Sequence, residues 1–114
     1  MDTHLELRDQ ILRELKKILI DTFCDTEAKV YLFGSWARKE EKQTSDIDIA
    51  VEGYRQFSPS KWQELNDRVE ESLIPYYVDI VDLENASKEL IQNVKKEGIL
   101  WKDFNNELKQ QKGH

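Results

Sequence analysis

One stretch, residues 32–51, limits the fold of this chain more than any other, because it joins a strand pattern, a glycine-serine turn and an alternating segment with two aspartates. Residues 28–33, which lead into it, are mostly apolar, aromatic or β-branched and predict a buried strand. Gly34 permits an unusual backbone and Ser35 is a favoured N-cap residue, so a short helix or a helical turn over residues 36–42 is expected to follow. The free N–H groups of that helix and the Ser35 hydroxyl would suit an anionic group, usually phosphate.

The second half of the stretch alternates between apolar and acidic side chains. Ile47, Ile49 and Val51 fall on one face of a predicted strand, and Asp46 and Asp48 fall on the other. Residues two apart on a strand are separated by about 7 Å, so the two carboxylates can converge on one or two hard cations. Without a cation they would repel each other. Mg²⁺ suits such a site, because it takes one or two carboxylates together with phosphate oxygens of a substrate.

A third acidic position is expected on a later strand, residues 76–83, which follows a proline break. If Val78 and Ile80 share the core with the isoleucines of the earlier strand, Asp79 lies on the same face as the first two aspartates. A charge in the middle of a strand is costly to bury unpaired, so it requires a cation or a partner. Asp79 is therefore predicted to be the third carboxylate. The alternative, Asp82, has the opposite orientation and would be solvated or begin the next turn.

The spacing of these motifs resembles a known signature. Gly-Ser, ten intervening residues and Asp-x-Asp are similar to the pattern of the nucleotidyltransferase superfamily that includes DNA polymerase β, and in particular to its minimal nucleotidyltransferases. The residues that fit the pattern are Gly34, Ser35, Ala37, Arg38, Ser45, Asp46, Ile47, Asp48 and Val51, and Asp79 continues the fit. The sequence departs from it at Lys39, where the family usually has a second glycine.

The resemblance implies a reaction and a set of site residues. Asp46, Asp48 and Asp79 would be both catalytic residues and metal ligands, holding two Mg²⁺ ions. The nucleotide-binding residues would be Gly34, Ser35, Arg38 and Ser45, with ATP as the substrate. For Arg38 the residues alone leave two interpretations open, a contact with the triphosphate or a salt bridge that holds the following loop. The expected reaction transfers a nucleoside monophosphate, AMP in particular, to a hydroxyl acceptor, with charge neutralisation supplying much of the rate.

The resemblance also implies a partner protein. Minimal nucleotidyltransferases of this kind resemble the antitoxins of HEPN/MNT toxin–antitoxin pairs, in which the nucleotidyltransferase can adenylylate a tyrosine of a HEPN ribonuclease and silence it. The acceptor expected here is therefore a tyrosine of a HEPN-domain partner. The alternative is a non-catalytic antitoxin that blocks its partner by occlusion. A homo-oligomer and a hetero-oligomer both remain open.

Composition limits the remaining classes of function. The chain has 114 residues, enough for a single domain over residues 1–114 with a flexible tail at 102–114. The net charge is −6 with both signs interspersed, which argues against direct binding to nucleic acid. The single Cys24 excludes an internal disulfide, and no apolar run approaches 18 residues, so we expect a cytoplasmic protein without a membrane contact.

The flanking segments predict three helices around the strands. The first covers residues 3–22, the second begins at Ser58-Pro59 and presents a stripe ending at Leu73, and the third has Asn85 as N-cap and ends at Gly98. Residues 39–42 are charged and predict a solvated face. Together these elements predict an α/β (α+β) fold like the polymerase β palm, a small mixed sheet with an acidic face and with all helices packed on the opposite face.

Overall fold

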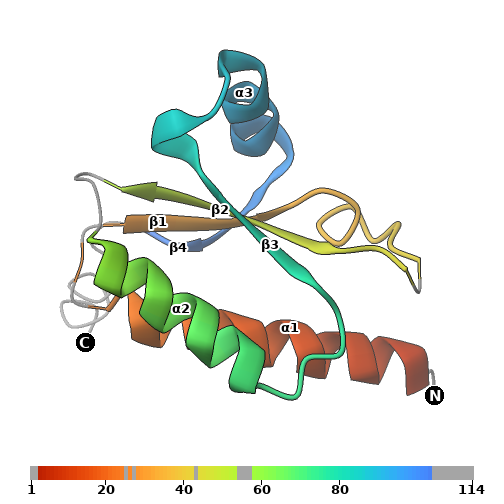
Figure 1. Ribbon diagram of the computed structural model, residues 1–114. Helices are drawn as coiled ribbons and strands as arrows, with labels where there is room; N and C mark the ends of the chain where they lie inside the picture. The colour runs from red at the N-terminus through yellow and green to blue at the C-terminus, as the bar shows by residue number, and fades with distance from the viewer. Residues whose placement is uncertain (1–2, 25, 27, 43, 54–57, 104–114) are drawn as a thin grey trace, which may run out of the picture.

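A mixed sheet with helices on both faces forms the molecule in a computed structural model that describes residues 3–24, 26, 28–42, 44–53 and 58–103 (Figure 1). The elements in chain order are α1 (Thr3–Thr22), β1 (Ala28–Phe33), β2 (Ile47–Gly53), α2 (Pro59–Glu71), β3 (Val78–Asp82), the 3₁₀ turn η1 (Leu83–Asn85), α3 (Lys88–Glu97) and β4 (Ile99–Lys102). The strand order is β3-β2-β1-β4, with β2 and β3 parallel and the other pairs antiparallel. The predicted mixed α/β fold is therefore confirmed.

The face covered by α1 and α2 holds the main core. Leu15 and Leu19 of α1, and Phe23 just after its end, are fully buried in one cluster with the isoleucines of β2, Ile47 and Ile49, as their spacing predicts. The apolar side of each element is removed from water here, which is the main source of stability in a domain of this size. Below the sheet in Figure 1, the two helices run side by side across this face.

Helix α2 begins as predicted but ends earlier than its apolar stripe suggests. Ser58 caps it by accepting a hydrogen bond from the Lys61 N–H, and Pro59 occupies the first turn. The helix stops at Glu71, where the Ser72 N–H bonds to a carbonyl of the last turn. Leu73, predicted to face the core, is 94% exposed because it lies beyond the helix end.

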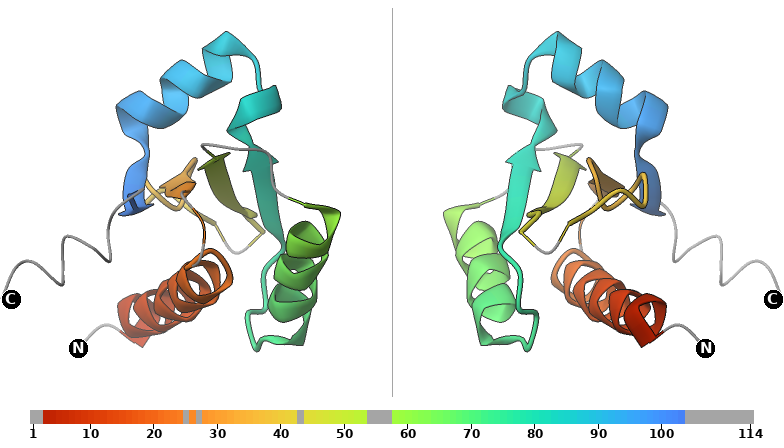
Figure 2. Two further views of the ribbon diagram at one scale, coloured as in Figure 1. Left: turned by 90° about the vertical axis from the view of Figure 1, so that its left-hand side faces the viewer. Right: turned by 90° about the vertical axis from the view of Figure 1, so that its right-hand side faces the viewer.

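Helix α3 corrects the expectation that all helices pack on one face. It lies on the opposite side of the sheet from α1 and α2, as Figures 1 and 2 show. Its Val94 packs with Tyr31 of β1 and Ala50 of β2 in a second, smaller core. Because side chains alternate along a strand, Ala50 lies on the same face as Asp48, away from the main core. This face therefore has an apolar patch that a helix can cover. The N-cap is Ser87; Asn85, predicted for that role, lies in η1.

The C-terminal apolar segment forms the edge strand β4, which pairs with β1. Lys102, assigned from the sequence to a tail over 102–114, belongs to this strand and is buried, with its Nζ donating to the Ala28 carbonyl at 3.1 Å. The remainder of that predicted tail, 104–114, lies outside the described residues. Among the helices described, none has the length and apolar character needed to cross a membrane.

Candidate active site

Parallel pairing of β2 and β3 places two of the three predicted carboxylates side by side. Asp48 and Asp79 are register partners, and adjacent strands lie about 4.8 Å apart, so their side chains leave the same face of the sheet. Asp46 lies just before β2 and is exposed. Val78 and Ile80 pack on the main core, which fixes the orientation of Asp79 predicted from the sequence. The structure therefore brings the predicted acidic residues to one end of the sheet.

The electrostatics of Asp48 reflect this crowding. Burial raises the pKa of its carboxyl above the ordinary value, and the nearby charges of Asp79 and then Asp46 raise it further. The Arg38 guanidinium acts in the opposite direction and lowers this pKa. Folding thus assembles like charges that repel one another, an arrangement typical of sites where a cation or a reacting group is bound.

Asp82, the alternative third carboxylate, has a structural role. Its side chain accepts a hydrogen bond from the Glu84 N–H at 3.0 Å and from the Asn85 amide at 2.8 Å. It caps η1 and so begins the next turn, as the alternative interpretation of this residue expected.

Gly34 is required at the end of β1 for two separate reasons. Its φ is +76°, in the left-handed region that favours glycine. Its neighbour Phe33 is the register partner of Asp48, and a Cβ placed on Gly34 would overlap the Asp48 carboxylate. The Gly-Ser turn and the Asp48 carboxylate are therefore in van der Waals contact, and any side chain at position 34 would displace the carboxylate.

The segment after Gly34 forms successive tight turns, so of the two predicted forms it has the helical turn and not the helix. The N–H groups of Ala37 and Arg38 both bond to the Gly34 carbonyl, at 3.1 and 3.2 Å. Lys39 then adopts a φ of +60°, and this left-handed residue ends the helical path after one turn. The Ser35 and Trp36 N–H groups are not used in the hydrogen bonds that close these turns. The phosphate-binding role of Ser35 stays a prediction.

Arg38 and Ser45, the other predicted nucleotide-binding residues, both stabilise the loop. Arg38 Nε donates to Glu40 at 3.0 Å, and its Nη1 lies 3.6 Å from a carboxylate oxygen of Glu97 on α3. This is the loop-holding interpretation left open by the sequence, although Arg38 also acts electrostatically on the acidic site. The Ser45 hydroxyl accepts the Lys42 N–H at 2.9 Å. A nucleotide contact by either residue stays a prediction.

Sequence reasoning missed a buried ion pair behind this loop. Arg8 Nε donates to Glu41 Oε2 at 2.7 Å, and the two side chains are 9% and 7% exposed. The solvated face predicted for residues 39–42 is wrong for Glu41, whereas Lys39, Glu40 and Lys42 are exposed. The sequence carried one signal: Arg8 stands three residues before Ile11, on the apolar stripe of α1, where a charge requires a partner.

Carboxylate oxygens, the donors on the acidic face, suit Mg²⁺, but few side chains converge on one point. Within the described ranges, no three or more His, Cys, Asp or Glu side chains are arranged to hold a metal ion. Mg²⁺ binds through one or two carboxylates and fills its octahedron with water and phosphate oxygens. Asp48 and Asp79, with Asp46 nearby, could hold such an ion together with a nucleotide's phosphates.

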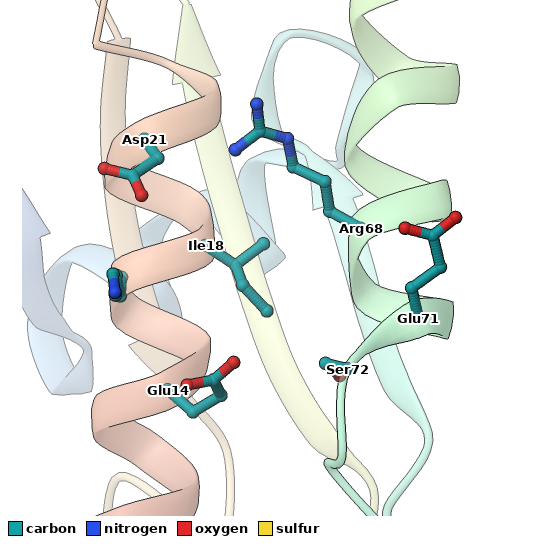
Figure 3. A pocket seen from close by; sticks show the side chains of 7 residues that line it. Glu14, Ile18, Asp21, Arg68, Glu71 and Ser72 are labelled. Carbon is teal, nitrogen blue, oxygen red and sulfur yellow. The ribbon is translucent and has the colours of Figure 1, made fainter.

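A hollow lies on the side of the sheet opposite Asp48 and Asp79. It measures about 270 Å³ and lies between α1 and α2 (Figure 3). Glu14 and Asp21 of α1 line it opposite Arg68 of α2, together with Lys17, Ile18, Glu71 and Ser72. Charges of both signs line it. Because it lies on the opposite face of the sheet from Asp48 and Asp79, its side chains cannot take part in chemistry at those two residues.

Comparisons with known proteins agree with this geometry. The family model described as Polymerase beta, Nucleotidyltransferase matches residues 13–107. A relative named "Putative protein adenylyltransferase MJ1217", from Methanocaldococcus jannaschii, is 32% identical over 101 residues, which cover 89% of this chain and 99% of that protein. A second one from the same organism, "Putative protein adenylyltransferase MJ1215", is 40% identical over 81 residues, covering 71% and 90%.

Solved structures show the same similarity. A crystal structure of a toxin–antitoxin with AMP-PNP superposes with a TM-score of 0.63 at 31% identity, covering 82% of this chain and 78% of that one. A structure of a tri-AMPylated HEPN toxin of Shewanella oneidensis in complex with an MNT antitoxin gives a TM-score of 0.60 at 25% identity, with coverages of 90% and 78%. The resemblance found in the sequence is therefore confirmed.

Proposed function

Because the chain belongs to the polymerase β nucleotidyltransferase family, we propose that it transfers AMP from ATP to a hydroxyl group of a partner protein, with Mg²⁺ at the acidic face. The observation that carries the proposal is the pairing of Asp48 with Asp79 directly beside the Gly34 turn. A cation held by this pair would lie next to a phosphate bound at the turn. The relatives named as protein adenylyltransferases support AMP as the group transferred.

The proposed chemistry assigns each residue a role. The acceptor oxygen forms a bond to the α-phosphorus of ATP, and the bond to the bridging oxygen of the β-phosphate breaks, so that pyrophosphate leaves. Asp46 and Asp48 would hold the divalent ions, which neutralise charge on the triphosphate. The backbone N–H groups of Ser35 and Trp36 would bind the departing phosphates. Asp79, the exposed member of the register pair, would take up the proton of the acceptor hydroxyl.

The proposed acceptor is a tyrosine of a HEPN-domain toxin, which the modification would silence, so that this chain acts as the antitoxin. The support comes from the structural neighbours: one is a complex of an MNT antitoxin with a HEPN toxin that carries AMP groups, and another is a toxin–antitoxin holding an ATP analogue.

The test is a pull-down with this chain, followed by intact-mass measurement of a captured HEPN-domain partner after incubation with the chain, ATP and Mg²⁺. We expect the partner to gain the mass of one or more adenylyl groups, and we expect no gain with Asp48→Asn. Asp67→Asn on the exposed surface of α2 is the matched control and should behave like the wild type. An unmodified partner, with the wild-type protein folded and both substrates present, would overturn the proposal. Neutralisation of the partner without nucleotide would establish the alternative, occlusion.

A further inference from the structure

We propose that Arg8 and Glu41 are positioning residues that fix the loop carrying the Gly-Ser turn and Asp46 against α1. The catalytic consequence rests on the function proposed above, whereas the effect on the loop does not. Neither residue lies on the acidic face. They act from behind it, through the loop of residues 34–46.

The Arg8 guanidinium makes several contacts with this one loop. Besides the bond to Glu41 Oε2, it donates through Nη2 to the Trp36 carbonyl and lies 5.7 Å from the centroid of the Trp36 ring. A guanidinium has its donors in a fixed fork, so these contacts determine an orientation as well as a distance. Arg8 itself is held in place because Ile11 and Leu15, further along the same helix, are buried in the main core.

Trp36 passes this constraint on to the segments that carry the aspartates. Its side chain is 2% exposed, and its Nε1 donates to the Ser45 carbonyl at 3.4 Å, next to Asp46. The ring also packs edge-on against Tyr76, with 5.1 Å between centroids, just before the strand that carries Asp79. The Trp36 indole therefore contacts the residues just before Asp46 and Asp79, and Trp36 directly follows Ser35 in the chain. Holding Trp36 in place would fix the positions of Ser35, Asp46 and Asp79 relative to one another.

The burial of Glu41 shows that the loop depends on Arg8. In the part of the chain that the structure describes, Glu41 Oε1 is buried and has no hydrogen-bond partner. The bond from Arg8 to Oε2 therefore compensates most of the burial of this carboxylate. A buried anion that loses its cation is strongly unfavourable and would draw the loop out toward water. An apolar pair could fill the same space without this cost, so the ion pair is better explained by a requirement for one loop geometry than by stability alone.

The test separates loop position from folding. The double variant Arg8→Met/Glu41→Leu replaces the pair with apolar side chains and leaves no buried charge. We expect it to remain folded, with at least a tenfold higher KM for ATP, a kcat within about threefold of wild type, and faster deuterium uptake in peptides covering residues 34–46. The matched control, Arg68→Met/Glu64→Leu, removes a 2.9 Å pair on the surface of α2 and should leave all three quantities unchanged.

Two single variants keep the proposal falsifiable if the double variant does not fold. Glu41→Gln retains the shape of the side chain, and Arg8→Lys retains the charge without the fork. Both should raise the KM and speed exchange in the loop, Arg8→Lys less than Glu41→Gln. Wild-type KM and wild-type exchange in the folded variants would overturn the proposal. An inactive wild-type protein would count against the proposed function, and the exchange measurement would still decide whether Arg8 and Glu41 hold the loop.

Discussion

The two faces of the sheet differ in the side chains that the same strands present to them. On the face toward α1 and α2, alternate residues of β2 such as Ile47 and Ile49 are fully buried among apolar neighbours. On the other face the alternate residues are Asp48 and Ala50, and α3 covers the apolar one. At the charged end of that face, burial and then the repulsion from Asp79 and Asp46 raise the pKa of Asp48.

This difference teaches that stability and chemistry are separated by the period of the strand. Along β2, Ile47 and Ile49 face the main core, whereas on the other face Asp48 belongs to the acidic site and Ala50 to the smaller core. Substitutions on the first face should lower the free energy of unfolding and leave the site intact. Substitutions of Asp48 or Asp79, at the charged end of the other face, should remove activity with little or no loss in the free energy of unfolding.

The largest expected effect comes from neutralising the acidic face. Asp48→Asn should lower kcat/KM for the proposed AMP transfer by about a thousandfold or more, equivalent to about 4 kcal/mol, because a carboxylate proposed to hold Mg²⁺ is lost. The unfolding free energy should stay the same or rise, since a repelled, partly buried charge is removed. Steady-state kinetics and denaturant unfolding of the same preparation check both. A large loss of stability would break the comparison between the faces.

The opposite pattern is expected in the main core. Leu15→Ala should lower the unfolding free energy by about 2–5 kcal/mol, because it leaves a cavity in a fully buried cluster. The specific activity of the remaining folded molecules should be unchanged. Urea denaturation gives the first quantity, and activity normalised to the folded fraction gives the second. Leu100→Ala, at a position 47% exposed on β4, serves as the control and should have a much smaller effect.

Gly34→Ala should affect both quantities, since this residue belongs to the fold and the site. The left-handed backbone and the overlap with Asp48 should cost about 1–3 kcal/mol of stability. Displacement of the carboxylate should lower activity about a hundredfold. Thermal unfolding and kinetics of the variant test this. An unchanged activity would show that the contact between Gly34 and Asp48 is unimportant.

A smaller effect, in the stabilising direction, is expected at Lys39. Its φ of +60° strains a residue with a Cβ, so Lys39→Gly should raise the unfolding free energy by about 0.5–1 kcal/mol, after the greater entropy of glycine in the unfolded chain is subtracted. Lys42→Gly, at another exposed position of the loop, is the comparison and should not stabilise. Differential scanning calorimetry of the two variants distinguishes them.

The smallest expected effect is a pH dependence that belongs to Asp48. Its folded-state pKa lies above the ordinary 3.8, so its contribution to stability is fully present below the unfolded pKa and is lost as pH rises through the folded pKa. Without metal, the stability of the wild type relative to Asp48→Asn should therefore fall as pH rises from about 3 to 6. Parallel denaturant titrations at several pH values measure it, and a difference independent of pH would contradict the shift.

The sequence predicted which face of the sheet Asp48 and Asp79 occupy, because a strand has a period of two. The alternation around Asp48 and the apolar neighbours of Asp79 were enough to place both side chains on one face, and the register then made them partners. The capping signal at Ser58 and the extent of α1 were likewise local, and both were confirmed.

The features that could not be predicted depend on contacts between distant segments. The turns after Ser35 replace a helix because Lys39 takes a left-handed backbone, which its residue type does not favour. Glu41 is buried because Arg8 reaches it from another element, 33 residues away. The face covered by α3 depends on the apolar patch around Ala50, which combines residues from four segments.

The most direct test of the central account is the thermal stability of wild-type protein and Asp48→Asn, each with and without Mg²⁺ and a non-hydrolysable ATP analogue. A ligand that binds only the folded state raises the free energy of unfolding by RT ln(1 + L/Kd), where L is the free ligand concentration, and so raises Tm. The account predicts that unliganded Asp48→Asn melts at or above the wild-type temperature, and that the metal–nucleotide pair raises the Tm of wild type alone. A variant that melts lower than wild type and gains the same shift would contradict it.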